Sequence, residues 1–200
     1  IITSDTDDPH EFDIPIQILV SLDQKGFPIN DIVIKSSPII VDLYGNNFQN
    51  IIFGSDDNNV YGYMIDGIEM FGFPYSTGDD VRSSPAVADL DKNNIMELIV
   101  GSHDGSLSIL SGFGNQVATH QVNGSINGSP AAVDLDQNGD LEVVFTSFNG
   151  NSGDVHAIHH DGSTFYGFPV YLNEKMMGGA ATGDLDGDGY AEIVVCTDDD

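Results

Sequence analysis

Three acidic segments of nine residues place oxygen-bearing side chains at matching positions. Positions 1, 3, 5 and 9 are Asp, Asn or Glu, and position 7 can offer its backbone carbonyl. Oxygen ligands at this spacing suit a hard cation such as Ca²⁺. The predicted ligands are Asp89, Asp91, Asn93, Ile95 and Glu97 in the first segment, Asp134, Asp136, Asn138, Asp140 and Glu142 in the second, and Asp184, Asp186, Asp188, Tyr190 and Glu192 in the third. Asp, Asn and Gly also form ordinary turns, but the shared register and the distal Glu favour calcium, with one ion in each of these three segments.

Each segment has to fold as a tight loop. Gly139 and Gly189 at position 6 permit a sharp turn, and Asn94 must adopt a left-handed conformation at the same position. An EF-hand would need Glu at position 12, but position 12 here is Val or Phe within a short apolar run. Apolar, β-branched runs of this length indicate buried strands. We therefore expect each loop to join two strands of a hairpin.

A fourth segment begins at Asp42 with the same spacing. Tyr44 at position 3 and Asn50 at position 9 stand where the other segments have carboxylates, so we expect no calcium there. The four segments begin at residues 42, 89, 134 and 184, and thus recur every 45 to 50 residues. Their apolar runs and later turn motifs indicate four short strands per unit, which is the repeat length of a β-propeller blade.

The outer strands of each unit are marked by turn motifs. Asp-Gly at 66–67 and at 161–162 predicts a hairpin turn into a fourth strand, which we expect to end in Phe-Gly-Phe-Pro at 71–74 and Tyr-Gly-Phe-Pro at 166–169. The second unit lacks this motif, so its outer edge is expected to differ. The predicted fold is all-β, with about four β-propeller-type repeats of four-stranded antiparallel blades and incomplete terminal ones. The expected parts are an acidic segment with outer strands (1–35), blades at 36–82, 83–128 and 129–177, and half a blade at 178–200.

Residues 36–200 resemble the FG-GAP (VCBS-like) repeats of integrin-α-type β-propellers. The resemblance rests on runs such as Ser84-Pro85-Ala-Val-Ala-Asp89-Leu-Asp91 and Glu97-Leu-Ile-Val-Gly101-Ser102, together with the later Gly-Phe-Pro. It implies radially arranged blades, calcium held in the hairpin between the first two strands of a blade, and an extracellular setting. It also implies recognition or scaffolding more often than catalysis.

Composition narrows the possible partners. The chain has 32 acidic and 5 basic residues and a formal charge of −27. Nucleic acid is excluded as a partner because phosphate binding needs clustered Lys and Arg. No apolar run approaches the ~20 residues of a membrane span. Calcium loops without a helical switch element favour an extracellular location, secreted or on the cell surface, where such sites stay filled.

Other residues with possible chemistry receive structural interpretations. His156, His159 and His160 could suggest a metal site, but surface or hydrogen-bonded histidines are the preferred reading because no second cluster completes a site. The single Cys196 is expected to be a packed, inert thiol. Asn123 and Asn127 lie in glycosylation acceptor patterns between blades.

Two function classes follow. The favoured one is a non-catalytic, calcium-stabilised extracellular propeller acting in adhesion or as a scaffold, with other copies of itself or a protein or glycan surface as partner. The alternative is part of a secreted polysaccharide lyase, although the five basic residues show no grouping that would stabilise developing negative charge. An apolar stretch at 14–22 reads as a strand. We expect it to add to the last blade of another copy and so build a fibre.

Overall fold

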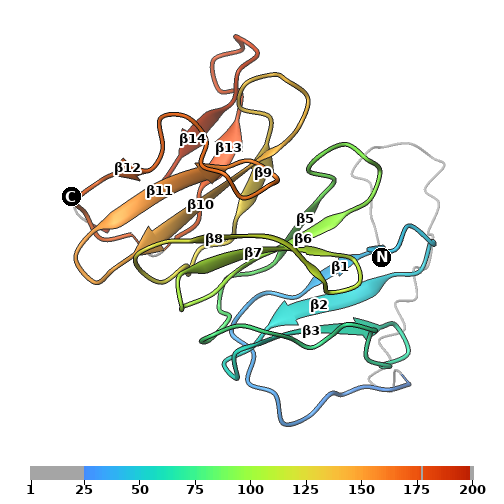
Figure 1. Cartoon of the computed structure of the whole chain (residues 1–200). Coiled ribbons are helices and arrows are strands. Elements are labelled where there is room, and N and C mark those ends of the chain that lie inside the picture. The colour runs from blue at the N-terminus through green and yellow to red at the C-terminus, as the bar shows by residue number, and fades with distance from the viewer. Residues whose placement is uncertain (1–24, 177, 199–200) are drawn as a thin grey trace, which may run out of the picture.

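The computed structural model describes residues 25–176 and 178–198. Within these residues the chain is all-β: strands form four antiparallel sheets, and no helix occurs. Figure 1 shows that the sheets follow one another in chain order, so each is a unit of consecutive strands. The described part of the chain accordingly has no helix long and apolar enough to cross a bilayer.

Three of the units have four strands and the last has two. Unit 1 comprises β1 (Ile39–Val41), β2 (Asn50–Gly54), β3 (Asn59–Met64) and β4 (Tyr75–Ser76). Unit 2 comprises β5 (Ala86–Ala88), β6 (Glu97–Gly101), β7 (Ser106–Ser111) and β8 (Gln116–Gln121). Unit 3 comprises β9 (Ala131–Val133), β10 (Glu142–Phe148), β11 (Gly153–Ile158) and β12 (Val170–Tyr171), and unit 4 comprises β13 (Ala181–Gly183) and β14 (Glu192–Val194). The predicted four-stranded antiparallel units are confirmed.

The second strand of a unit is apolar on both faces because neighbouring units cover both. In β6, Leu98 and Val100 pack in one core cluster with Ile52 of unit 1. Ile99, which points to the opposite face, packs with Val143 of unit 3. A third cluster joins unit 3 to unit 4. The units therefore stack face to face, and the first strands β5, β9 and β13 lie next to one another.

The outer edges differ from the sequence prediction in one respect. The Phe-Gly-Phe-Pro motif at 71–74 is predicted to end the fourth strand, but β4 begins directly after it, at Tyr75. Gly72 has a φ of 85°, and a Cβ there would meet the carbonyl oxygen of Phe113, so the motif forms a turn that packs against unit 2. Unit 2 lacks the motif and, as predicted, has a different edge: β8 has six residues and the β7–β8 pairing is irregular at Ile109/Leu110.

The prediction of a packed Cys196 thiol is wrong, because this side chain is exposed. At the equivalent positions, Gly54 pairs with Val60 and Gly101 pairs with Leu107 of the third strand. Cys196 instead follows the end of β14, and within the described residues no third strand pairs with β14. The predicted strand at 14–22 lies outside the described residues, as does the acidic start of the chain.

Candidate metal centres

The acidic loops connect the first and second strands of units 2, 3 and 4, as predicted. Each loop brings the carboxylates of positions 1, 3 and 9 together, with their ligand atoms within 4.8 Å of one another. The three groups are Asp89, Asp91 and Glu97; Asp134, Asp136 and Glu142; and Asp184, Asp186 and Glu192. Position 9 lies deepest, because Glu97 and Glu142 are buried.

Two left-handed residues give every loop its shape. At position 6, Asn94 has a φ of 67° and Gly139 a φ of 104°, which confirms the predicted turn. Position 4 is also left-handed, with φ values of 55° at Lys92, 61° at Gln137 and 82° at Gly187. The left-handed conformation at position 4 is not evident from the sequence, because Lys92 and Gln137 carry no turn signature. Only Gly187 and, in the first loop, Gly45 could have indicated it.

The loop backbone donates hydrogen bonds to the acidic and amide side chains, and Asp184 accepts with both oxygens, its Oδ1 from the N–H of Gly187 at 2.7 Å. At position 1, the Oδ2 atoms of Asp89, Asp134 and Asp184 accept the position 6 N–H at 2.9, 3.0 and 3.0 Å. Position 3 accepts the N–H of position 5, and the position 5 oxygen accepts the N–H of position 7, in all three loops. These bonds hold the side chains in place before any ion is considered.

The distal Glu closes each loop from the other strand. Its Oε2 atom accepts the N–H of the Leu at position 2, at 3.0 Å for Glu97, 2.9 Å for Glu142 and 2.7 Å for Glu192. Burial raises the pKa of Glu97; the hydrogen bond from Leu90 opposes this shift, and the neighbouring Asp91 and Asp89 charges add to it. A cation would relieve this cost because it neutralises the clustered carboxylates.

Two oxygen atoms provide the test of whether calcium fits. Asp89 Oδ1 and Asp134 Oδ1 are buried and have no hydrogen-bond partner. A buried, unpaired carboxylate oxygen is costly unless a cation or a donor meets it. Both atoms belong to position 1 of a carboxylate cluster, where a calcium ligand is expected. The donor set contains only oxygen atoms and thus fits Ca²⁺. Positions 5 and 7 do not belong to the carboxylate clusters and stay predicted ligands.

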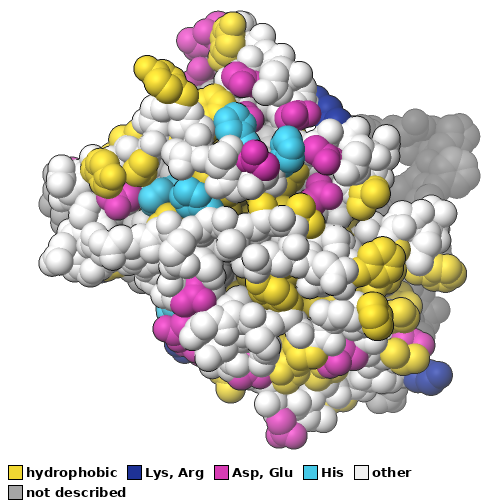
Figure 2. Space-filling view, in the orientation of Figure 1, with side chains coloured by type: hydrophobic (Ala, Val, Ile, Leu, Met, Phe, Trp, Pro, Cys, Tyr) yellow, Lys and Arg dark blue, Asp and Glu magenta, His cyan; other side chains and the backbone are white. Residues whose placement is uncertain are grey.

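Histidines adjoin the third unit's loop, which the sequence analysis did not anticipate. His159 Nδ1 lies 3.1 Å from Glu142 Oε1 and donates to it, since an ionised carboxylate can only accept. His160 Nδ1 is 4.0 Å from Asp140 Oδ2. Figure 2 shows histidine side chains beside acidic ones in the upper part of the view. The hairpin register could have indicated this contact, because Val143 pairs with Ile158 and places residue 159 opposite Glu142.

His156 follows the structural interpretation made from the sequence. It is buried in β11, hydrogen bonded to Ser147 Oγ at 2.9 Å and stacked on Phe145 with ring centroids 4.9 Å apart. Burial and the nearby His120 lower its pKa to about 4. Because β11 ends at Ile158, His159 and His160 belong to the turn that follows.

The first loop has the same fold as the others, but positions 3 and 9 are Tyr44 and Asn50 and carry no carboxylate. Asp42 Oδ2 accepts the N–H of Asn47 at 2.6 Å, and Asn50 Oδ1 accepts the N–H of Leu43 at 3.2 Å, as Glu97 does for Leu90. Among the described residues, no metal-type cluster includes Asp42. The expectation that the first loop binds no calcium stays a prediction.

Consecutive loops touch through the side chain of position 4. Gln137 Nε2 donates to the carbonyl oxygen of Gly189, position 6 of the next loop, at 2.7 Å. The side chain of Lys92 likewise reaches position 6 of the next loop. Its Nζ atom would lie 3.4 Å from a Cβ built on Gly139. The loops of units 2, 3 and 4 therefore form a connected row.

Comparison with known proteins supports the repeat assignment. Residues 134–195 match the FG-GAP-like repeat family, which confirms the predicted repeat type in this part of the chain. The fold is similar to that of the V. cholerae biofilm matrix protein Bap1, with a TM-score of 0.59 and 21% identity over 82% of this chain and 28% of that chain. It is also similar to BBS1N, crystallised in complex with ARL6DN, with a TM-score of 0.57 and 11% identity over 86% of this chain and 50% of that chain. No curated protein matches the sequence. The chain thus spans half or less of these solved structures.

Proposed function

We propose that this chain, which contains an FG-GAP-like repeat, is a calcium-stabilised, non-catalytic extracellular module for adhesion or scaffolding. The observation that carries the proposal is the set of three carboxylate clusters, two of them with a buried oxygen that has no partner. Calcium at these loops would join the first two strands of each unit. The structural likeness to a biofilm matrix protein is compatible with an extracellular role.

The proposed arrangement of the units is that of propeller blades. Face-to-face stacking of consecutive sheets, with first strands β5, β9 and β13 side by side, is what radial blades require. In such a repeat, each unit is stabilised by its own loop and by its neighbours. Calcium would then act as a structural clip, one per loop, that keeps a strongly acidic chain compact.

Calcium titration tests the proposal directly. Isothermal titration calorimetry should give three equivalents of calcium, one per carboxylate cluster. An ion that binds only the folded state at 100 to 1,000 times its Kd stabilises it by about 3 to 4 kcal/mol. Excess EGTA should therefore lower the melting temperature by several degrees per site. An unchanged melt with and without EGTA would contradict the proposal.

The non-catalytic part of the proposal has its own test. A polysaccharide lyase acting on acidic sugars needs a base and cationic groups beside it. Among the described residues Arg82 and Lys35 are both paired with Asp56, at 2.8 Å each, and Lys175 with Asp198. Incubation with pectin-type polymers should release no unsaturated products absorbing in the ultraviolet. Sustained release of such products would favour the lyase alternative.

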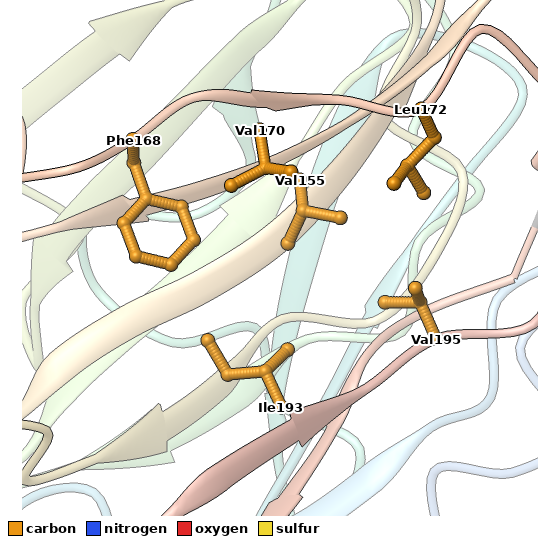
Figure 3. A pocket seen from close by; sticks show the side chains of 6 residues that line it. All are labelled: Val155, Phe168, Val170, Leu172, Ile193 and Val195. Atoms are coloured by element: carbon orange, nitrogen blue, oxygen red, sulfur yellow. The ribbon is translucent and has the colours of Figure 1, made fainter.

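We also propose that copies assemble by strand addition at unit 4. In unit 2 the third strand pairs with the second along its whole length, for example Leu98 with Leu110. β14 has no such partner among the described residues. An apolar cleft of about 220 Å³ lies beside it. Figure 3 shows the side chains that line this cleft: Val155, Phe168, Val170, Leu172, Ile193 and Val195. The proposed occupant is the apolar stretch 14–22 of a second copy, which itself lies outside the described residues.

Light scattering over a concentration series tests the assembly. The wild-type chain should form species larger than 21.4 kDa that grow with concentration. Ile18→Pro removes a backbone donor within the added strand and should abolish growth. Thr6→Pro, a proline in the same acidic region but outside residues 14–22, is the matched control and should leave assembly intact. A monodisperse 21.4 kDa species at all concentrations would exclude strand addition.

A further inference from the structure

The row of loops has a gap between units 1 and 2. Position 4 of the first loop is Gly45, which has no side chain to reach the next loop as Gln137 and Lys92 do. A cleft of about 330 Å³ lies there instead, between Tyr44 and Gly45 on one side and Asn94, Ile95 and Met96 on the other. A Cβ at Gly45 would meet no atom within 4 Å, so a side chain at this position would have room to enter the cleft.

Two departures from the repeat meet in a second cleft of about 300 Å³, which adjoins the first and is lined by Tyr44, Ile95 and Phe113 among others. Tyr44 occupies loop position 3, where the calcium loops have Asp. Phe113 occupies the turn position held by Asp66 in unit 1 and Asp161 in unit 3. Their rings are stacked, with centroids 5.1 Å apart and planes inclined by 29°. Both substitutions replace an acidic residue with an aromatic one, and they are in contact although they lie in different units.

The two clefts share Tyr44 and Ile95, and we call them together the Tyr44–Phe113 cleft. This combined cleft has exposed apolar surface and an acidic group. Phe113 and Ile95 are 56% and 57% exposed, and Met96 is 40% exposed. Figure 2 shows hydrophobic side chains gathered at the right of the view, where the loop between β1 and β2 lies. Asp42 lines the same cleft, and within the described part of the chain no ion pair involves it. Exposed apolar surface rimmed by polar groups is typical of binding sites.

We propose that the Tyr44–Phe113 cleft binds a cationic side chain, Arg or Lys, presented by a partner polypeptide. The formal charge of −27 disfavours anionic and attracts cationic partners. An aromatic pair next to a carboxylate suits a guanidinium or ammonium group, because the ring faces and the negative charge both attract it. The aliphatic stem of the same side chain would lie against Ile95 and Met96. This site contains none of the clustered carboxylates, although Asn94 and Ile95 belong to the loop of unit 2, so the test is made with calcium in excess.

A charge series of small probes tests the site. Benzamidine, benzamide and benzoate share one ring and differ in charge, and their binding can be followed by nitrogen–proton correlation NMR in excess calcium. Benzamidine should bind with a Kd of about 1 mM, as expected for nine non-hydrogen atoms, and should shift the amides of residues 43–45, 94–96 and 112–114. Benzamide should bind about tenfold more weakly, and benzoate should not bind measurably.

The repeat itself supplies the variants. Gly45→Gln copies Gln137, which adopts a φ of 61° where Gly45 has 66°, so the change should fill the cleft in a left-handed conformation that Gln already adopts in unit 3. Phe113→Asn removes the ring without adding a negative charge that would itself attract benzamidine. Each should weaken benzamidine binding at least tenfold, with the calcium stoichiometry unchanged. Tyr166→Asn, at a side chain that is 96% exposed in unit 3, is the matched control and should bind as wild type.

The other outcomes would overturn the proposal. Equal binding of benzamidine and benzoate, or unchanged binding in the Gly45→Gln variant, would show that the cleft does not select cations. Stronger binding of methyl glucoside than of benzamidine, with the same amide shifts, would assign the cleft to glycans. Since these readouts do not depend on calcium stoichiometry, failure here would leave the calcium proposal standing, and the reverse also holds.

Discussion

At position 1 of the acidic loops in units 2 and 3, the two oxygens of the Asp side chain have different surroundings. Asp134 Oδ2 accepts the N–H of Gly139 and so fixes the turn, whereas Asp134 Oδ1 is buried without a partner. The first oxygen is needed for the loop to fold, and the second makes sense only with a cation beside it. Asp42 shares the first task, through Asn46 and Asn47, but has no carboxylate cluster around it.

Removing these carboxylates should therefore have different effects on calcium. We expect Asp134→Ala to lose one calcium equivalent and about 3 kcal/mol of calcium-dependent stability. Asp42→Ala should lose only about 1 kcal/mol, from its hydrogen bonds to the loop, and no calcium. Calorimetric titration and melts with and without EGTA measure both effects. A wild-type stoichiometry of four would show that the first loop also binds an ion.

The buried His156 predicts a pH dependence of stability. Its pKa is lowered to about 4 in the folded chain by burial and by His120, whereas an unfolded His titrates near 6.5. Between these values only the unfolded chain takes up the proton, so stability is highest above pH 6.5 and falls as pH decreases toward 4. From pH 7 to pH 5 the loss should be about 2 kcal/mol.

His156→Gln tests this assignment, because Gln can keep the hydrogen bond to Ser147 but cannot take up the proton. The free energy of unfolding, measured by urea denaturation in excess calcium, should depend less on pH in the variant than in the wild-type chain. Parallel pH profiles for the two proteins would mean that other groups cause the acid sensitivity.

The acidic hairpins depend on backbone conformations that few side chains tolerate. Asn94→Val places a β-branched residue at a φ of 67°, where such residues are strained by about 1 to 2 kcal/mol. We expect a lower melting temperature and weaker calcium binding at this loop. Ile95→Val, one residue along and outside the left-handed region, is the control and should change neither value appreciably.

The same hairpins show which parts of the fold the sequence predicts. Apolar runs and loop spacing were sufficient to predict the strand pairs, because these signals are local. The left-handed conformation of Asn94 was predicted because the equivalent residues of units 3 and 4 are Gly. The outer strand was misplaced because Gly72 packs against Phe113 of another unit. The burial of Cys196 was wrongly predicted because, among the described residues, no third strand pairs with β14. His159 was missed for a similar reason, since only the pairing register brings it to Glu142.

For the whole molecule, charge is the dominant property. Three bound calcium ions would reduce the formal charge only from −27 to −21, so self-repulsion persists in the filled state. Without calcium the repulsion is concentrated within a few ångströms at each cluster. We expect added sodium chloride to raise the melting temperature in EGTA clearly more than in calcium, because screening replaces part of the ions' effect. Equal salt dependence in both conditions would contradict this.

The contacts from Lys92 to the Gly139 loop and from Gln137 to Gly189 also couple each loop to the next one along the chain. Ordering one loop fixes the group against which its neighbour rests, so a second ion binds to a loop that has less freedom to lose. Calcium should then bind with positive cooperativity along units 2 to 4, and Gln137→Ala should lower the Hill coefficient toward one. Gly45 has no side chain that could make this contact, so unit 1 should not share in the cooperativity among units 2 to 4.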